Sequence, residues 1–294
     1  MKRNRFQFVR GFTLVELIVV MVVMAILSGL SAMAYRGIAE DLRMSSAQNM
    51  VTSAIDNARA LSIKKNRYVI TVFRPRLINN NTEQVIDIIP AIWNGDSANA
   101  DNGNGGIWTY DRFVPIQGIE PRTIASGVNV AGPGYGTGDD DTWWVCTYLP
   151  ANTGVPDNEP FGSMIGVLYS PEGRVVVRNA KSGSDRIWVD FNWDWIQTIN
   201  DDEEVDWQDP NVVTDPWGEA LPGLGEYFDI ETPSTEPFIS MTPILAVFNE
   251  KEFRTTVDTS NWNDSGYRDN KYTEFIDKNA ERIQFNRYSG VQLK

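Results

Sequence analysis

Few residues of this chain could carry out acid–base or nucleophilic chemistry. The sequence contains no histidine, and Cys146 is its only cysteine. A histidine-dependent catalytic triad and an intramolecular disulfide are therefore excluded, as are most catalytic zinc sites, which use histidine ligands. Paired carboxylates, or a serine with a lysine, remain as the available catalytic chemistry. Cys146 lies in the run WWVCTY and is predicted to be a small buried side chain.

One pair of carboxylates lies in an aromatic run. Asp190 and Asp194 belong to the sequence IWVDFNWDW, residues 187–195, which could form a sugar-binding or glycosidase surface. Successive side chains of a strand point to opposite faces, so both aspartates would share one face, while Val189 and Phe191 would share the other. This alternation predicts a half-buried strand with an apolar inner face, and it favours core packing over catalysis.

Other acidic residues cluster in polar segments. Carboxylate oxygens are the ligands that calcium prefers, but no segment has the ligand spacing of a helix–loop–helix calcium site. The sequence therefore favours solvated acidic loops and leaves calcium open as a cofactor. The residues concerned are Asp96, Asp101, Asp139, Asp140, Asp141, Asp201, Asp202, Glu203 and Glu204.

A further carboxylate, Glu16, opens a long apolar run. Residues 17–35 contain no charged side chain, and as a helix they would span about 28 Å, close to the roughly 30 Å hydrocarbon core of a bilayer. Four basic residues lie among residues 1–10, and such residues remain cytoplasmic. These features predict a single-pass anchor whose C-terminal part lies outside the cytoplasm. The alternative is a secretory signal peptide, but its apolar core is usually shorter.

The residues around Glu16 form a motif. The sequence RGFTLVEL, residues 10–17, resembles the prepilin peptidase recognition sequence of type IV pilins and of the pseudopilins of type II secretion. The resemblance implies that residues 1–11 are a basic leader, that cleavage occurs between Gly11 and Phe12, and that Phe12 is then N-methylated. Glu16 matches the family's glutamate. Many pilins have a proline where this chain has Met33, a departure that pseudopilins and minor pilins tolerate.

Assembly in that family gives the glutamate a role. Cleavage would expose an ammonium group on Phe12, and Glu16 of a neighbouring subunit could pair with it inside a bundle of helices. Because either charge left alone in a low-dielectric core costs free energy, the pair would also set the register between subunits. The alternative is that Glu16 is a solvated carboxylate at the membrane interface.

The helix is expected to continue beyond the apolar run. Apolar residues recur at i, i+4, i+7, i+8 and i+11 from Ala47 to Ala58, which is the spacing of one helical stripe. No proline occurs before Pro75. We therefore expect one helix over residues 12–63, of which about 12–35 lie in the membrane.

Strand-like segments rich in β-branched and aromatic residues follow the helix. They cover residues 67–73, 84–89, 143–148, 164–169, 174–178, 186–191, 244–248 and 283–292. A helix followed by many short strands predicts an α+β fold, in which an antiparallel sheet forms one globular domain over residues 64–294.

One hairpin extends the resemblance. Ser170-Pro171-Glu172-Gly173 has proline second and glycine fourth, as suits a tight turn between strands. Residues 55–73 together with the hairpin 164–177 are similar to H-type minor pseudopilins. Residues 94–106 and 200–237 have no counterpart in that resemblance and are predicted to be loops.

These features predict a structural subunit and not an enzyme. The resemblance implies other pilin or pseudopilin subunits, the prepilin peptidase, the inner-membrane assembly platform and membrane lipid as partners. It places the chain in the inner membrane until it joins a periplasmic or surface filament. Nucleic acid is not an expected partner, because the formal net charge of −13, or −17 without the four basic leader residues, repels phosphate backbones. The alternative class is a membrane-anchored extracytoplasmic domain that binds or hydrolyses carbohydrate.

Overall fold

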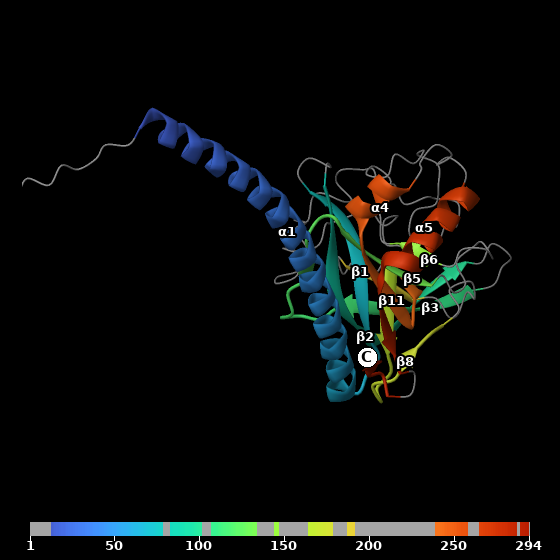
Figure 1. Ribbon diagram of the computed structural model, residues 1–294. Coiled ribbons are helices and arrows are strands. Elements are labelled where there is room, and N and C mark those ends of the chain that lie inside the picture. Colours follow the sequence, from blue (N-terminus) through green and yellow to red (C-terminus); the bar gives the residue numbers. More distant parts are fainter. Residues whose placement is uncertain are drawn as a thin grey trace, which may run out of the picture. The chain divides into compact units, whose positions relative to one another are not determined.

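The computed structural model describes residues 13–78, 83–101, 107–133, 144–146, 164–178, 187–191, 239–257, 265–286 and 289–293. The chain divides into two compact units, Met1–Arg43 and Met44–Lys294. Helix α1, Leu14–Lys65, contributes to both units, and all the strands belong to the second (Figure 1).

Helix α1 has clear signals at both ends. Thr13 caps its start, where the Thr13 hydroxyl accepts a hydrogen bond from the Glu16 amide. At its end, Asn66 adopts a left-handed conformation with φ of 51°. The Asn66 amide then donates to the Ile63 carbonyl, and the Arg67 amide donates to the Ser62 carbonyl. This pair of hydrogen bonds is a Schellman motif, which satisfies carbonyls that the helix leaves without partners.

The first sheet of the second unit has a main path of six strands in the order β10-β7-β1-β2-β3-β9, with β4 paired to β2 and β8 paired to β7. The bounds are β1 Val69–Ile78, β2 Glu83–Asp101, β3 Ile107–Pro115, β4 Arg122–Ile124, β7 Met164–Tyr169, β8 Val175–Val176, β9 Ile187–Val189 and β10 Ile239–Met241. The β10–β7 and β3–β9 pairs are parallel, and the other pairs are antiparallel.

This sheet is strongly curled. Its end strands β9 and β10 are five places apart in the hydrogen-bonded order, yet they lie against each other. One hydrophobic cluster consists almost entirely of residues from the sheet itself, among them Val72, Phe113, Ile187 and Ile239. Such a cluster is expected where the concave face of a curled sheet closes on its own side chains.

The second sheet has the order β13-β12-β11-β5-β6. Its strands are β5 Val128–Pro133, β6 Trp144–Cys146, β11 Ile244–Asn249, β12 Glu281–Phe285 and β13 Gln292–Leu293. Helices α4, Glu250–Thr256, and α5, Ser265–Asn279, contribute Phe253 and Phe275 to an aromatic cluster with Phe248 of β11. In Figure 1 these two helices appear in orange and red.

The largest cluster joins the second half of α1 to both sheets. Val51 and Ile55 on α1 belong to it together with Phe73 of the first sheet and Leu245 of the second. The stripe predicted from Ala47 to Ala58 therefore anchors the helix within the second unit.

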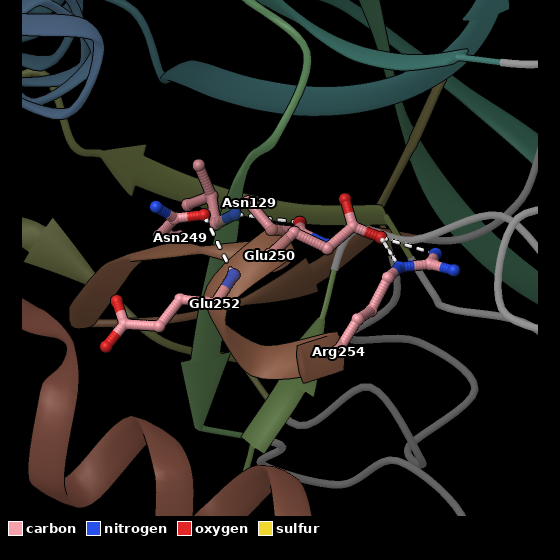
Figure 2. A network of polar contacts seen from close by, with 6 residues as sticks. Asn129, Asn249, Glu250, Glu252 and Arg254 are labelled. Atoms are coloured by element: carbon pink, nitrogen blue, oxygen red, sulfur yellow. Dashed lines mark hydrogen bonds and ion pairs between the residues drawn. The ribbon is translucent and has the colours of Figure 1, made fainter. Parts of the chain in front are cut away.

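Helix α4 begins at a local polar network (Figure 2). The Asn249 side chain accepts a hydrogen bond from the Glu252 amide, as an N-cap residue does. The Glu250 amide donates to the Gly127 carbonyl, and the Glu250 carboxylate accepts two hydrogen bonds from the Arg254 guanidinium, at 2.6 and 3.1 Å. The buried carboxylate of Glu250 is thus neutralised by a residue one helical turn away.

The structure confirms the α+β class, the long helix and the hairpin at Ser170. There the Gly173 amide donates to the Ser170 carbonyl, the Ser170 amide donates to the Arg174 carbonyl, and Gly173 has a φ of 75°. Only glycine adopts this conformation readily, so the turn chemistry read from the sequence holds.

Two expectations were wrong. Residues 94–101, predicted to be loop, belong to β2, whose pairing with β3 shifts register between Trp93 and Ser97. Residues 187–191, predicted to be half-buried, are buried on both faces. Strands β3, β4, β5 and β10 and helices α4 and α5 were not predicted. The predicted loop 200–237 lies outside the described residues.

Candidate assembly site at the start of helix α1

Glu16 and Thr13 form a reciprocal pair at the start of α1. The Glu16 carboxylate oxygen Oε2 accepts hydrogen bonds from the Thr13 amide at 2.8 Å and from the Thr13 hydroxyl at 2.9 Å. The Thr13 hydroxyl in turn accepts the Glu16 amide at 3.2 Å. This arrangement is a capping box, in which a first-turn glutamate satisfies an amide that the helix cannot.

The capping box leaves part of the carboxylate available. Both bonds from Thr13 reach the same oxygen, Oε2, so within the described residues no hydrogen bond reaches Oε1. A carboxylate has acceptor sites on both oxygens. Glu16 can therefore keep its capping role and still accept from a cation that approaches Oε1.

The surroundings of Glu16 are apolar and exposed. All described side chains from Leu14 to Ser31 are exposed, and the large hydrophobic ones among them face every direction around the helix. Within the described residues, Leu14–Ser31 is the one helical segment long and apolar enough to cross a membrane. A helix that is apolar all round needs lipid or other apolar helices around it.

The other residues predicted for this site cannot be placed beside it. Gly11 and Phe12 lie outside the described residues, so cleavage and N-methylation there stay predictions. Thr13 was not singled out from the sequence, although Thr13-x-x-Glu16 is the spacing of a capping box and could have indicated the contact.

A second polar centre joins segments that are far apart in sequence. We call it the Arg59 junction: Arg59 on α1, Tyr169 and Gly173 of the β7–β8 hairpin, and Ser289 and Gly290 near the C-terminus. The Arg59 Nε donates to the Gly173 carbonyl at 3.3 Å and to the Ser289 carbonyl at 2.9 Å. Figure 1 shows the end of α1, β8 and the C-terminus gathered at the bottom of the view.

The junction is closely packed. A Cβ added to Gly290 would collide with the Gly173 carbonyl oxygen, and one added to Gly173 would lie 2.7 Å from the Cδ1 atom of Ile63. The Tyr169 hydroxyl donates to the Gly290 carbonyl at 3.4 Å. Burial, with a smaller contribution from the Asp56 carboxylate, raises the pKa of Tyr169, so the hydroxyl keeps its proton. The junction thus brings together the helix end and the hairpin that resemble H-type minor pseudopilins.

Asp190, the carboxylate residue within residues 187–191 of the aromatic run, is buried and does not lie on an exposed surface. Asp190 is 0% exposed, and its Oδ2 accepts from two nitrogens of Arg112, itself 1% exposed. In the pairing of β3 with β9, Arg112 on β3 lies opposite Trp188 on β9. This buried ion pair links the segment that follows β9 to strand β3, while Asp194 lies outside the described residues.

The expectation of no cofactor, with calcium left open, stays a prediction. The described part of the chain contains no group of three or more acidic or cysteine residues placed to hold a metal ion. Asp96 and Asp101 belong to β2, whereas residues 139–141 and 201–204 lie outside the described residues. Cys146 ends strand β6.

The described residues form one candidate membrane span with a capped carboxylate at its start, and an α+β unit that follows it in the sequence. Residues 8–32 match the family model described as the prokaryotic N-terminal methylation motif. The chain thus carries the N-terminal motif of the type IV pilin-like proteins, which are substrates of prepilin peptidase. No curated protein and no solved structure matches the chain, so the resemblance to the H-type subgroup stays a prediction.

Proposed function

We propose that this chain is a minor pseudopilin or minor pilin, a structural subunit of a type II secretion pseudopilus or of a type IV pilus-like filament. Prepilin peptidase cleaves it between Gly11 and Phe12 and N-methylates Phe12. The observation that carries the proposal is an exposed apolar helix with a methylation motif and a single carboxylate, Glu16, in its first turn.

Before assembly the helix is held in the inner membrane, and the second unit lies outside the cytoplasm. Assembly at the inner-membrane platform transfers the helix from lipid to a bundle of helices from other pilin or pseudopilin subunits. Helix–helix contacts then replace the lost lipid contacts, so the transfer needs little change in apolar burial. Apolar contacts alone therefore do not select one register between neighbouring helices, whereas the position of a charged group on each helix does.

Glu16 provides that charge. The Phe12 ammonium of a neighbouring subunit approaches Oε1, while Oε2 keeps its bonds from Thr13. In a low-dielectric bundle a charge without a partner is strongly destabilising, so subunits pack in the register that pairs the two groups. A carbohydrate-binding or hydrolytic role has no such support, because Asp190 is buried in its pair with Arg112.

The proposal is tested by three variants of the full-length chain in its native membrane: Glu16→Ala, Glu16→Gln and Thr13→Val. Mass spectrometry of the N-terminus, carbonate extraction and the amount of subunit in sheared filaments are measured for each. We expect every variant to be inserted and to begin at methylated Phe12. Both Glu16 variants should be lost from filaments, because neither offers a negative charge to the ammonium.

Thr13→Val is the matched control. It removes the hydroxyl of the capping box but keeps the shape of the side chain and the Glu16 charge, and it should still enter filaments. If Thr13→Val were lost as completely as Glu16→Ala, Glu16 would act as a helix cap and not as an intersubunit partner. An intact Met1 in the mature protein, or normal assembly of Glu16→Ala, would contradict the proposal itself.

A further inference from the structure

The second unit, Met44–Lys294, has exposed large hydrophobic side chains in one place among its described residues. They are Ile63 at the end of α1, which is 49% exposed, and Val291 and Leu293 in the C-terminal segment, which are 47% and 50% exposed. We call these three residues the end patch. The other large hydrophobic side chains described in this unit are buried or half-buried, so the end patch is the one apolar surface that the described unit leaves uncovered.

The Arg59 junction brings the end patch together. Gly173 lies between its two parts: a Cβ added to Gly173 would meet the Ile63 side chain, and one added to Gly290 would meet the Gly173 carbonyl. Val291 follows Gly290, and Val291 and Leu293, two residues apart in an extended segment, share a face. The patch is therefore held in place by closely packed backbone.

Cations border the end patch. Lys64 and Lys65 follow Ile63 at the end of α1, and both are exposed and form no ion pair within the described residues. Arg174 in the hairpin is exposed as well, and Glu172 provides one opposite charge beside it. This positive border belongs to a chain whose formal net charge is −13. A surface that fits the patch is therefore apolar at its centre and carries carboxylates opposite the two lysines.

The second unit of another copy of this chain does not fit the end patch. Among its described residues it offers no other exposed large hydrophobic side chain, so an apolar contact between two such units would place patch against patch. That contact would bring Lys64 and Lys65 of one copy close to the same lysines of the other, and like charges that face each other across an interface cost free energy. The composition of the patch thus favours a different chain as the partner.

We propose that the end patch binds a filament subunit other than this chain, through an apolar surface whose carboxylates face Lys64 and Lys65. The inference rests on the proposed function, because a minor subunit has subunits of other kinds as its neighbours. Burial of the three hydrophobic side chains contributes affinity. The pairs between lysines and carboxylates select the partner and set its orientation, because complementary charge acts mainly on specificity.

Photo-cross-linking tests the contact in the full-length chain, expressed in its native membrane. A benzophenone derivative of phenylalanine replaces Val291, and in the control it replaces Glu274 on α5, which is 68% exposed. Mass spectrometry identifies the cross-linked protein, its N-terminus and the cross-linked peptide. From the Val291 position we expect a different protein that itself begins at an N-methylated residue, joined through a peptide with apolar residues and an excess of carboxylates. The Glu274 position should not give this product.

Charge exchange tests the chemistry of the contact with a matched pair of variants, Lys65→Glu and Lys278→Glu. Both lysines are exposed and lie in the last turn of a helix, α1 and α5, so both changes carry the same kind of cost at a helix C-terminus. Lys65→Glu should lower the cross-link yield severalfold, whereas Lys278→Glu should leave it unchanged. Replacing a carboxylate of the partner's cross-linked peptide by lysine should restore the yield with Lys65→Glu.

Several results would overturn the contact. They are a cross-link only to another copy of this chain, only to lipid or only to a protein without a methylated N-terminus, and the absence of any cross-link. Equal losses in the two lysine variants, or a missing rescue, would overturn it as well.

The N-terminus of the same preparation separates this inference from the proposed function. A chain that begins at methylated Phe12 and is present in filaments, but gives no cross-link from the end patch, leaves the proposed function standing and removes the contact. An intact Met1 would remove both.

Discussion

Helix α1 shows two kinds of surface in one continuous element. Among residues 14–31 the apolar side chains face every direction and are exposed; Ile18, for example, is 50% exposed. Among residues 44–65 the apolar side chains form one stripe, and Ile55, in that stripe, is 1% exposed. Both stretches are equally helical. The arrangement of apolar residues, and not helix propensity, therefore decides whether the chain covers its own helix or needs lipid or other subunits to do so.

The first prediction compares the two stretches by making the same change, isoleucine to alanine, in each of them. Ile55→Ala should lower the free energy of unfolding of the second unit by about 2–5 kcal/mol, because it opens a cavity in the core. Ile18→Ala should leave that free energy unchanged, because Ile18 has no packing partner in the described chain. Chemical denaturation of full-length protein in detergent, followed by tryptophan fluorescence, measures both. Equal losses would break the comparison.

The second prediction adds a charge to each stretch. Val22→Asp places a carboxylate near the centre of the span, at a cost of about 2.5–3.5 kcal/mol on insertion scales. We expect a smaller membrane-inserted fraction by carbonate extraction. Asn57→Asp adds the same charge to an exposed position in the second stretch and should not change insertion. Unchanged insertion of Val22→Asp would show that lipid does not surround the first stretch.

The third prediction concerns the Arg59 junction, which fixes the end of the second stretch. Gly290 and Gly118 both have positive φ, of 66° and 78°, but only at Gly290 would a Cβ meet other atoms. Gly118→Ala should cost about 1–2 kcal/mol of stability, for the backbone conformation alone. Gly290→Ala should cost about 1–3 kcal/mol more, because it overpacks the junction. Similar losses would mean that the C-terminal segment is not held against the hairpin.

The smallest expected effect lies in the hairpin of the same junction. A hydrogen bond from the Ser170 side chain, with a backbone hydrogen bond and the nearby Arg174, holds the pKa of Glu172 below its ordinary value of 4.5. A lowered carboxyl pKa stabilises the fold above the ordinary value, and this contribution is lost as pH falls through the lowered one. Ser170→Ala should raise the pKa of Glu172, as measured by NMR titration. An unchanged pKa would show that the Ser170 side chain does not hold the turn.

Local signals made the helix and the hairpin predictable. The stripe from Ala47 to Ala58 and the turn Ser170–Gly173 each depend on residues close in sequence, and the structure has both. Helix α4 had such a signal as well, because Asn249 with Glu252 three residues later resembles a capping box, but it was not used.

Long-range pairing explains what could not be predicted. The β10–β7 and β3–β9 pairs join segments distant in sequence, and they bury both faces of residues 187–191. Alternation of apolar and polar residues predicts a half-buried strand correctly only when one face of the sheet is in contact with solvent. Nothing local indicated that Arg112 would neutralise Asp190 or that Arg59 would reach Ser289. At the start of α1, the sequence motif indicated Glu16 as the candidate assembly residue. The motif could not indicate that Thr13 donates to only one of the two carboxylate oxygens, because that depends on the rotamer of Glu16.

The curl of the first sheet has a consequence for how this protein can change over evolutionary time. Strands β9 and β10 are far apart in the sequence, yet they lie against each other. A segment whose two ends are neighbours can be lengthened, shortened or exchanged with little effect on the elements that flank it. The contact between β9 and β10 thus allows the sequence between them to change in length while the strand registers stay as they are.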